Sequence, residues 1–429
     1  DVVYNHLGPD GAYAAACSRR FFSSSHESPW GAGINLDGPG STGVRAFFIE
    51  NALHWIHEYH LDGLRLDATH ALVDDGERHF LAELAARAHA EARDRTVLLF
   101  AEDSRNLACV VRPAPEGGWG LDAVWSDDLH HQVLRMLAGD AEGYFADFCG
   151  TAPDLATTLR QGWVFTGQHS PHEGGPRGTD PAGIPPRRFV VCIQNHDQVG
   201  NRALGERLHH QVDLSAYRAA SVLLLCAPQT PLLFMGQEWA AGTSFRFFTD
   251  HSPDLGRLVT EGRREEFRSF SSFSSPEARA RIPDPQSRTT FEDSRLRWEE
   301  REREPHASVL RLNRALLALR RDEPALRDAR ACGVEVSAVD TGTVLLRREA
   351  RDGAALVAVV RLLGSGVVEI PASALRGAPP GSWTAVLSTE DPEHSPDPLP
   401  IGLDPAGRTL QVRFARPGAV VLKVRAGTA

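Results

Sequence analysis

Several features are missing from this sequence, and each absence excludes a class of protein. No run of eighteen apolar residues occurs in the 429 residues, so we expect no membrane-spanning helix. No basic stripe stands out and the net charge is −10, which argues against nucleic acid as a main partner. With 42% hydrophobic and 24% charged residues, the composition is that of a soluble globular protein, and the length favours two domains.

Common ligand-binding motifs are also missing. No GxGxxG follows a predicted strand, and neither a GxxxxGK[ST] phosphate loop nor a GxSxG nucleophile turn occurs. No loop has EF-hand spacing. The cysteines have no paired spacing, so we expect buried thiols of a cytoplasmic protein rather than disulfides or a zinc site. They are Cys17, Cys109, Cys149, Cys192, Cys226 and Cys332.

The first three hundred residues alternate short β-like runs with amphipathic helical runs. This alternation predicts a parallel sheet covered by helices, either open or closed. The predicted strands are Val2–Tyr4, Gly63–Asp67, Val97–Ala101, Ala123–Trp125, Phe189–Gln194 and Pro231–Met235. The predicted helices span residues 43–60, 75–92, 127–138, 151–161, 214–227 and 306–321.

Three segments break this alternation. We expect residues 14–42 and 240–304 to be long irregular insertions, and residues 167–188 to be a connection rich in proline and glycine. After residue 328, short β-like runs separated by glycine and proline predict an all-β sandwich. The expected domains are therefore 1–328 and 329–429.

The stretch DGLRLDATH, residues 62–70, is the most informative part of the chain. In a strand, Gly63, Arg65 and Asp67 point to one side, and Leu64 and Leu66 point to the other. Catalytic residues of parallel α/β proteins lie at the carboxyl ends of strands. An arginine beside an aspartate keeps the carboxylate ionised and oriented, as a nucleophile requires, although many such pairs are purely structural.

Two further strands end in acids. Val97–Ala101 runs into Glu102 and Asp103, and Phe189–Gln194 runs into Asn195, His196 and Asp197. Three strands would thus bring Asp67, Glu102 and Asp197 to one end of the sheet. A protonated acid beside an ionised carboxylate is the working pair of a retaining glycosidase. A Mg²⁺ or Ca²⁺ site is the other use of three carboxylates.

Four ordered motifs carry a family resemblance. DVVYNH (1–6), GLRLD (63–67), AE (101–102) and NHD (195–197) resemble the four signature regions of the α-amylase superfamily of glycosidases. HDQVGNR and DDLHH favour the members that release trehalose from maltooligosyltrehalose. The likeness covers roughly residues 1–325.

The resemblance implies roles for the matching residues. Asp67 would be the nucleophile, Glu102 the acid and then the base, and Asp197 would grip the sugar and stabilise the transition state. Arg65 would orient Asp67, and His6 and His196 would bind the sugar. Acceptor-side contacts are implied for His70, Asp103, Asp127, Asp128, His130 and His131.

The resemblance also implies a fold. It predicts a (β/α)₈ barrel of which this chain holds strands three to eight, followed by the β-sandwich. Two earlier strands and an amino-terminal β domain would then be missing, and we expect the chain expressed alone to be insoluble or molten. No cofactor and no metal are expected.

Some readings stay open at this point. Trp30 and Trp239 suit a sugar-stacking platform and a core tryptophan equally well. A glucan branching enzyme or another transglycosylase shares the chemistry up to the covalent intermediate. An inactive barrel that binds carbohydrate or acts as a scaffold is the alternative from another class. The oligomeric state is not indicated.

Overall fold

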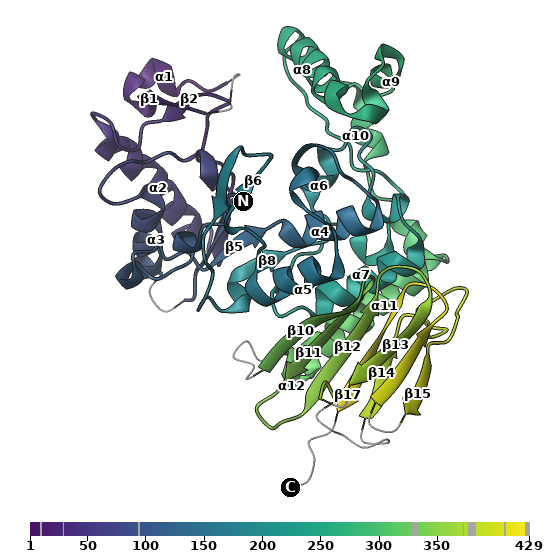
Figure 1. The fold of residues 1–429 in the computed structure, drawn as a ribbon. Helices are drawn as coiled ribbons and strands as arrows, with labels where there is room; N and C mark the ends of the chain where they lie inside the picture. Colours follow the sequence, from purple (N-terminus) through teal and green to yellow (C-terminus); the bar gives the residue numbers. More distant parts are fainter. Residues whose placement is uncertain are drawn as a thin grey trace. The chain divides into compact units, whose positions relative to one another are not determined.

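The computed structural model describes residues 1–8, 11–28, 30–92, 95–327, 333–371, 373–375, 383–406 and 409–424. The chain forms two compact units, whose helices and strands are labelled in Figure 1. Unit 1 comprises Asp1–Asp127 and Phe165–Val190, and unit 2 comprises Asp128–Val164 and Val191–Ala429. The expected boundary near residue 328 falls outside the described residues, and the division into 1–328 and 329–429 stays a prediction.

A parallel sheet organises unit 1. Its strands follow chain order: β3 (Gly63–Leu66), β4 (Leu98–Glu102), β5 (Ala123–Ser126) and the start of β8 (Phe189–Val191). Val2 pairs with Leu66 on the other side of β3. The alternation predicted for β3 is confirmed, because Leu64 and Leu66 are buried whereas Arg65 is half-buried. Gly63 is required here, since a Cβ would come within 2.2 Å of the Leu98 carbonyl oxygen.

Helices and two hairpins complete unit 1. The predicted helices are present as α2 (Ser41–His57) and α3 (Phe80–Glu91). The segment expected to be irregular instead contains α1 (Ala14–Cys17) and a hairpin of β1 (Phe22–Ser28) with β2 (Gly31–Ile34). The proline- and glycine-rich connection likewise holds a hairpin, β6 (Thr166–Ser170) with β7 (Gly175–Gly178).

Unit 2 contains the remaining elements of the region in which strands and helices alternate. Its helices are α4 (Asp128–Leu137), α5 (Ala152–Gln161), α6 (His196–Gly200), α7 (Leu214–Cys226), α11 (His306–Asp322) and α12 (Pro324–Arg327). Strand β9 (Thr230–Pro231) follows β8 in the sheet order, and Leu232 N–H donates to Val191 O. All residues from Ser215 to Cys226 are buried, so α7 is a central helix of this unit.

The second predicted insertion is helical rather than irregular. It contains α8 (Pro253–Glu266), α9 (Pro276–Ala280) and α10 (Arg288–Asp293) (Figure 1). A small buried cluster joins this insertion to the segment after α6, where Phe267 and Ile282 pack with Ala203. A serine followed by proline begins both α8 and α9, and this pair is a common start of a helix.

The predicted β-sandwich is confirmed. One antiparallel sheet has the order β10 (Gly333–Asp340), β11 (Thr343–Glu349), β12 (Ala355–Arg361), β17 (Gly418–Val424), β14 (Trp383–Ser388). The other has the order β13 (Gly366–Pro371), β16 (Thr409–Phe414), β15 (Gly402–Ala406). Val357, Val359 and Leu422 of the first sheet share a buried cluster with Ile370 and Phe414 of the second.

The expectation for the cysteines was wrong in part. Cys192 and Cys226 are buried and form no disulfide, but Cys17 and Cys149 are exposed and Cys109 is partly exposed. Cys17 ends the short helix α1, which has no buried residue, so its apolar neighbours do not form a core. Cys332 lies outside the described residues. Among the described helices, none has the length and apolar character needed to cross a membrane.

Candidate active site

The guanidinium of Arg65 joins the two acids that the sequence placed on neighbouring strands. Its Nη1 donates to Asp67 Oδ1 at 2.5 Å and to Asp1 Oδ1 at 2.9 Å. Its Nη2 forms an ion pair with Glu102 Oε2 at 2.6 Å. The carboxylates at the ends of β3 and β4 therefore flank one cation, as expected for groups that act on the same bond.

Further contacts fix the ends of these two strands against each other. Ala68 N–H donates to Glu102 Oε2 at 2.8 Å, and Ala68 has a positive φ of 39°. Thr69 Oγ1 donates to the Glu102 carbonyl at 2.8 Å. Non-glycine residues seldom adopt this backbone conformation, and it is concentrated at functional sites. The turn after Asp67 thus aims a backbone N–H at the second acid.

Two residues support this pair without having been assigned a role from the sequence. The buried Asn5 side chain donates to the Asp67 carbonyl at 2.7 Å and to Asp67 Oδ2 at 3.1 Å. The guanidinium of Arg65 lies 4.5 Å from the Trp125 ring centroid, a cation–π contact. Asn5 belongs to the DVVYNH motif and Trp125 ends a predicted strand, but only their positions in the fold show what they touch.

His6 and Trp30 form an aromatic pair in the same unit. Their rings are stacked with centroids 4.5 Å apart and planes 15° apart, and Trp30 is 50% exposed. His6 Nδ1 hydrogen-bonds Asn5 Oδ1, which links this pair to the residue that holds Asp67. Exposure of the Trp30 ring suits a platform for the apolar face of a sugar. Trp239, by contrast, is 4% exposed and packs as a core residue of unit 2.

The other predicted site residues of unit 1 differ in burial and in hydrogen bonding. Asp103 is buried and accepts two hydrogen bonds from the Arg105 guanidinium, one from the Arg105 backbone N–H and one from Thr69 Oγ1, which is the pattern of a structural carboxylate. His70 lies in the turn after Asp67, and its Nδ1 is a buried atom without a hydrogen bond within the described part of the chain. Asp127 is half-buried just after β5.

The third predicted acid, Asp197, belongs to unit 2. It lies in the first turn of α6, half-buried beside the exposed His196, and Asn201 Nδ2 donates to its Oδ1 at 2.6 Å. Arg263 of α8 donates to the carbonyls of Gly200 and Arg202, so the inserted helices support the end of α6. Its meeting with Asp67 and Glu102 stays a prediction.

Asp128, His130 and His131 lie inside unit 2. Asp128 accepts a hydrogen bond from Val164 N–H at 2.6 Å, and the His131 ring packs on Phe148. Burial lowers the pKa of His130 to about 3, so its imidazole is neutral. These surroundings favour packing roles, and the proposed contacts with substrate gain no support from them.

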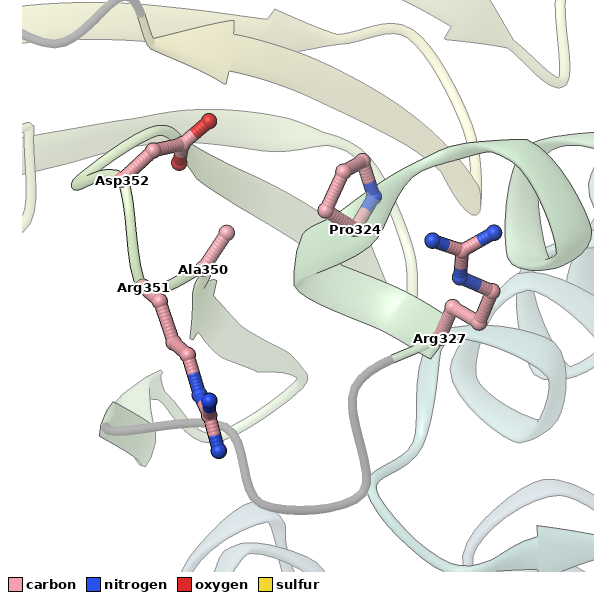
Figure 2. A pocket seen from close by; sticks show the side chains of 5 residues that line it. All are labelled: Pro324, Arg327, Ala350, Arg351 and Asp352. Atoms are coloured by element: carbon pink, nitrogen blue, oxygen red, sulfur yellow. The ribbon is translucent and has the colours of Figure 1, made fainter.

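A pocket of about 450 Å³ lies elsewhere in unit 2. Figure 2 shows its lining between α12 and the turn that joins β11 to β12. The lining residues are Pro324, Arg327, Ala350, Arg351 and Asp352. None of them is a predicted site residue, and the pocket lacks the paired carboxylates of a glycosidase.

Comparison with known proteins adds independent information. No protein-family model matches the sequence. Malto-oligosyltrehalose trehalohydrolase from Deinococcus radiodurans is 47% identical over 332 residues, which are 76% of this chain and 53% of that protein. The enzyme of the same name from Arthrobacter ramosus is 44% identical over 337 residues, 77% of this chain and 57% of that protein. The chain thus spans about half the length of the curated relatives it matches.

The solved structures agree with this likeness. A Salmonella typhimurium protein, provisionally named an alpha amylase, has a TM-score of 0.83 and 32% identity, with 99% of this chain and 67% of that chain covered. The alpha-amylase from H. orenii, at 15% identity and a TM-score of 0.54, shares the fold, with 93% of this chain and 70% of that chain covered.

Proposed function

Because the chain belongs to the α-amylase family of glycosidases, we propose that the full-length protein is a retaining α-glucan hydrolase. Its substrate is maltooligosyltrehalose, in which it cleaves the α-1,4 bond next to the terminal trehalose unit. The products are trehalose and a shortened maltooligosaccharide. The names of the relatives support this substrate, and the arrangement around Arg65 supports the reaction type.

The proximity of the Asp67 and Glu102 carboxylates around Arg65 is the observation that carries the proposal, and Glu102 must part from Arg65 and take up a proton before it can act as the acid. In the first step, a carboxylate oxygen of Asp67 forms an ester with the anomeric carbon while the bond to the leaving glucosidic oxygen breaks. Glu102 gives its proton to that oxygen, which leaves as a hydroxyl of trehalose. In the second step, Glu102 takes a proton from water, whose oxygen attacks the anomeric carbon and releases Asp67.

The residues around Asp67 and Glu102 orient the carboxylate of Asp67 and bind the sugar. Asn5 and Arg65 restrict the orientation of the Asp67 carboxylate, so one oxygen faces the anomeric carbon. Trp30 and His6 bind the sugar ring that reacts. Asp197 binds the hydroxyls of the same sugar and stabilises the positive charge of the transition state. No cofactor takes part.

The state of the cysteines indicates the cellular compartment in which the protein acts. Five cysteines among the described residues form no disulfide, and the lack of disulfides is typical of proteins in a reducing compartment. We place the reaction in the cytoplasm on this ground.

The test is trehalose release from maltotriosyltrehalose by the full-length protein and its variants. Asp67→Ala should remove nearly all turnover. Glu102→Gln should abolish hydrolysis of the natural substrate but retain activity on glycosides with good leaving groups, which need no proton. Asp62→Asn is a matched control, because the Asp62 side chain is 89% exposed near the same strand.

Four results would overturn parts of this proposal. A largely active Asp67→Ala variant would remove Asp67 from the nucleophile position. Rescue at Asp197→Asn instead of Glu102→Gln would exchange the roles of the two acids. Transfer products without trehalose would identify a transglycosylase such as a branching enzyme, and no turnover at all by a folded full-length protein would favour a binding module.

A further inference from the structure

Three separate segments of unit 1 bring metal-ligating side chains together, none of which is among the acids described above. His26 lies on β1, Asp37 lies between β2 and α2, and Asp75 lies between β3 and α3. One ligand atom from each residue lies within 4.8 Å of the other two. His26 Nε2 is 2.8 Å from Asp37 Oδ2 and 3.8 Å from Asp75 Oδ2.

We propose that these three side chains bind a divalent transition-metal ion, Zn²⁺ or Mn²⁺. One imidazole nitrogen and two carboxylate oxygens form a donor set that both ions accept, with water in the remaining positions. Around a tetrahedral ion with ligands at about 2.1 Å, neighbouring ligand atoms lie about 3.4 Å apart. The two distances from His26 lie on either side of this value, so small side-chain rotations complete the site.

The local charge favours a cation. Within the contacts of the described residues, the His26 imidazole is the one basic side chain that contacts Asp37 and Asp75, and no arginine or lysine pairs with them. Arg45 does not supply the missing charge, because its donors are used by Asp74, Glu83 and two backbone carbonyls. Two carboxylates sharing one imidazole leave net negative charge, which a divalent ion neutralises.

The site is also partly organised in advance. The Asp75 backbone N–H donates to Asp37 Oδ2 at 2.9 Å, which holds the two segments in contact. The side chains of Asp37 and His26 are only 11% and 17% exposed, whereas that of Asp75 is 82% exposed. Asp75 therefore provides the open side through which an ion enters, and the other two form the fixed base.

Binding would fasten the β1–β2 hairpin to the loop before α3. The turn of this hairpin carries Trp30, which stacks on His6. The ion would restrict the movement of the Trp30 platform, so on the proposed function its removal should raise KM more than it lowers kcat. This consequence rests on the proposed function, whereas metal binding itself does not.

Binding is measured on the full-length protein after treatment with a chelator, without substrate. Zn²⁺ is titrated by calorimetry and Mn²⁺ by electron paramagnetic resonance. We expect one ion per chain and a loss of affinity of about tenfold or more in Asp75→Asn. Glu77→Gln, which changes an exposed carboxylate of the same loop, should bind as the parent does.

A second variant shows whether a loss of metal binding comes from a lost ligand or from misfolding. Asp75 is too exposed for its substitution to disturb the core, and His26→Gln should lose the same affinity if the ligand set is right. The proposal is wrong if neither ion binds at millimolar concentration, or if a bound ion is retained equally by Asp75→Asn and His26→Gln. Because no substrate is present, these outcomes are independent of whether the protein releases trehalose.

Discussion

Replacing Arg65 by lysine should damage catalysis without unfolding the protein. Lysine keeps the positive charge, but its ammonium is a single point and cannot present two nitrogens to two carboxylates as a guanidinium does. In the structure, Arg65 contacts Asp67 through Nη1 and Glu102 through Nη2. Lysine would retain at most one of these contacts.

The size of the effect follows from the contact that is lost. A hydrogen bond to a charged group contributes about 1.5–3 kcal/mol. Since about 1.4 kcal/mol corresponds to a factor of ten in rate, kcat/KM should fall by about 10- to 150-fold. The fall should lie mainly in kcat, because Arg65 holds the reacting groups and is not expected to anchor the distant parts of the substrate.

The assay is the initial rate of trehalose release from maltotriosyltrehalose, with thermal denaturation measured in parallel. Arg87→Lys is the matched control, because Arg87 pairs with Glu50 and Glu91 at the surface of the same unit and is 44% exposed. Its activity should be unchanged. A value of kcat/KM for Arg65→Lys close to that of the parent would refute the reasoning that one guanidinium must serve both acids.

Three further predictions concern stability. Glu390→Gln should lower the free energy of unfolding by about 3–5 kcal/mol in urea titrations, because it leaves the buried Arg218 without its ion-pair partner. Arg263→Met removes hydrogen bonds to two carbonyls, that of the last residue of α6 and that of Arg202 just after it, and should lower the melting temperature by several degrees. Burial lowers the pKa of His130 and His209 to about 3, below the value of about 6.5 in the unfolded chain. Between these two pH values the unfolded state binds more protons than the folded state. The free energy of unfolding should therefore fall as the pH drops from about 7 to 5.

Each of these predictions has a control. Glu393→Gln changes an exposed carboxylate near Glu390 and should leave stability unchanged. Arg268→Met changes an exposed arginine just after α8 and should not alter the melting temperature. Replacing His130 by phenylalanine should reduce the dependence of stability on pH, and an unchanged dependence would contradict the assignment to buried histidines.

The sequence predicted the features that depend on local periodicity. The alternation of Leu64 and Leu66 with Arg65 and Asp67 was enough to place a charged face on β3. The apolar run before Glu102 placed that acid at the end of the next strand. Because neighbouring parallel strands end at the same edge, the meeting of these two acids followed from the pattern alone.

Features that depend on distant contacts were not predicted. Asn5 supports Asp67 across 62 positions of sequence, and no local pattern shows such a contact. The resemblance implied that His131 contacts substrate, which stays a prediction, but no local pattern showed that its ring packs against Tyr144, Phe145 and Phe148. The helices in residues 240–304 were not predicted, although a serine–proline pair marks the start of two of them. The sequence therefore contained a signal for these helices that the prediction did not use.

The covalent intermediate provides the most direct test of the proposed mechanism. The full-length protein is incubated with 5-fluoro-α-glucosyl fluoride, which forms the glycosyl ester quickly. Because this ester hydrolyses slowly, the protein can be digested and the labelled peptide analysed by mass spectrometry. We predict one added glycosyl group on the peptide that contains Asp67, with the configuration of the released sugar retained. A label on another carboxylate, or an inverted product without a covalent adduct, would contradict the assignment of Asp67 as the nucleophile.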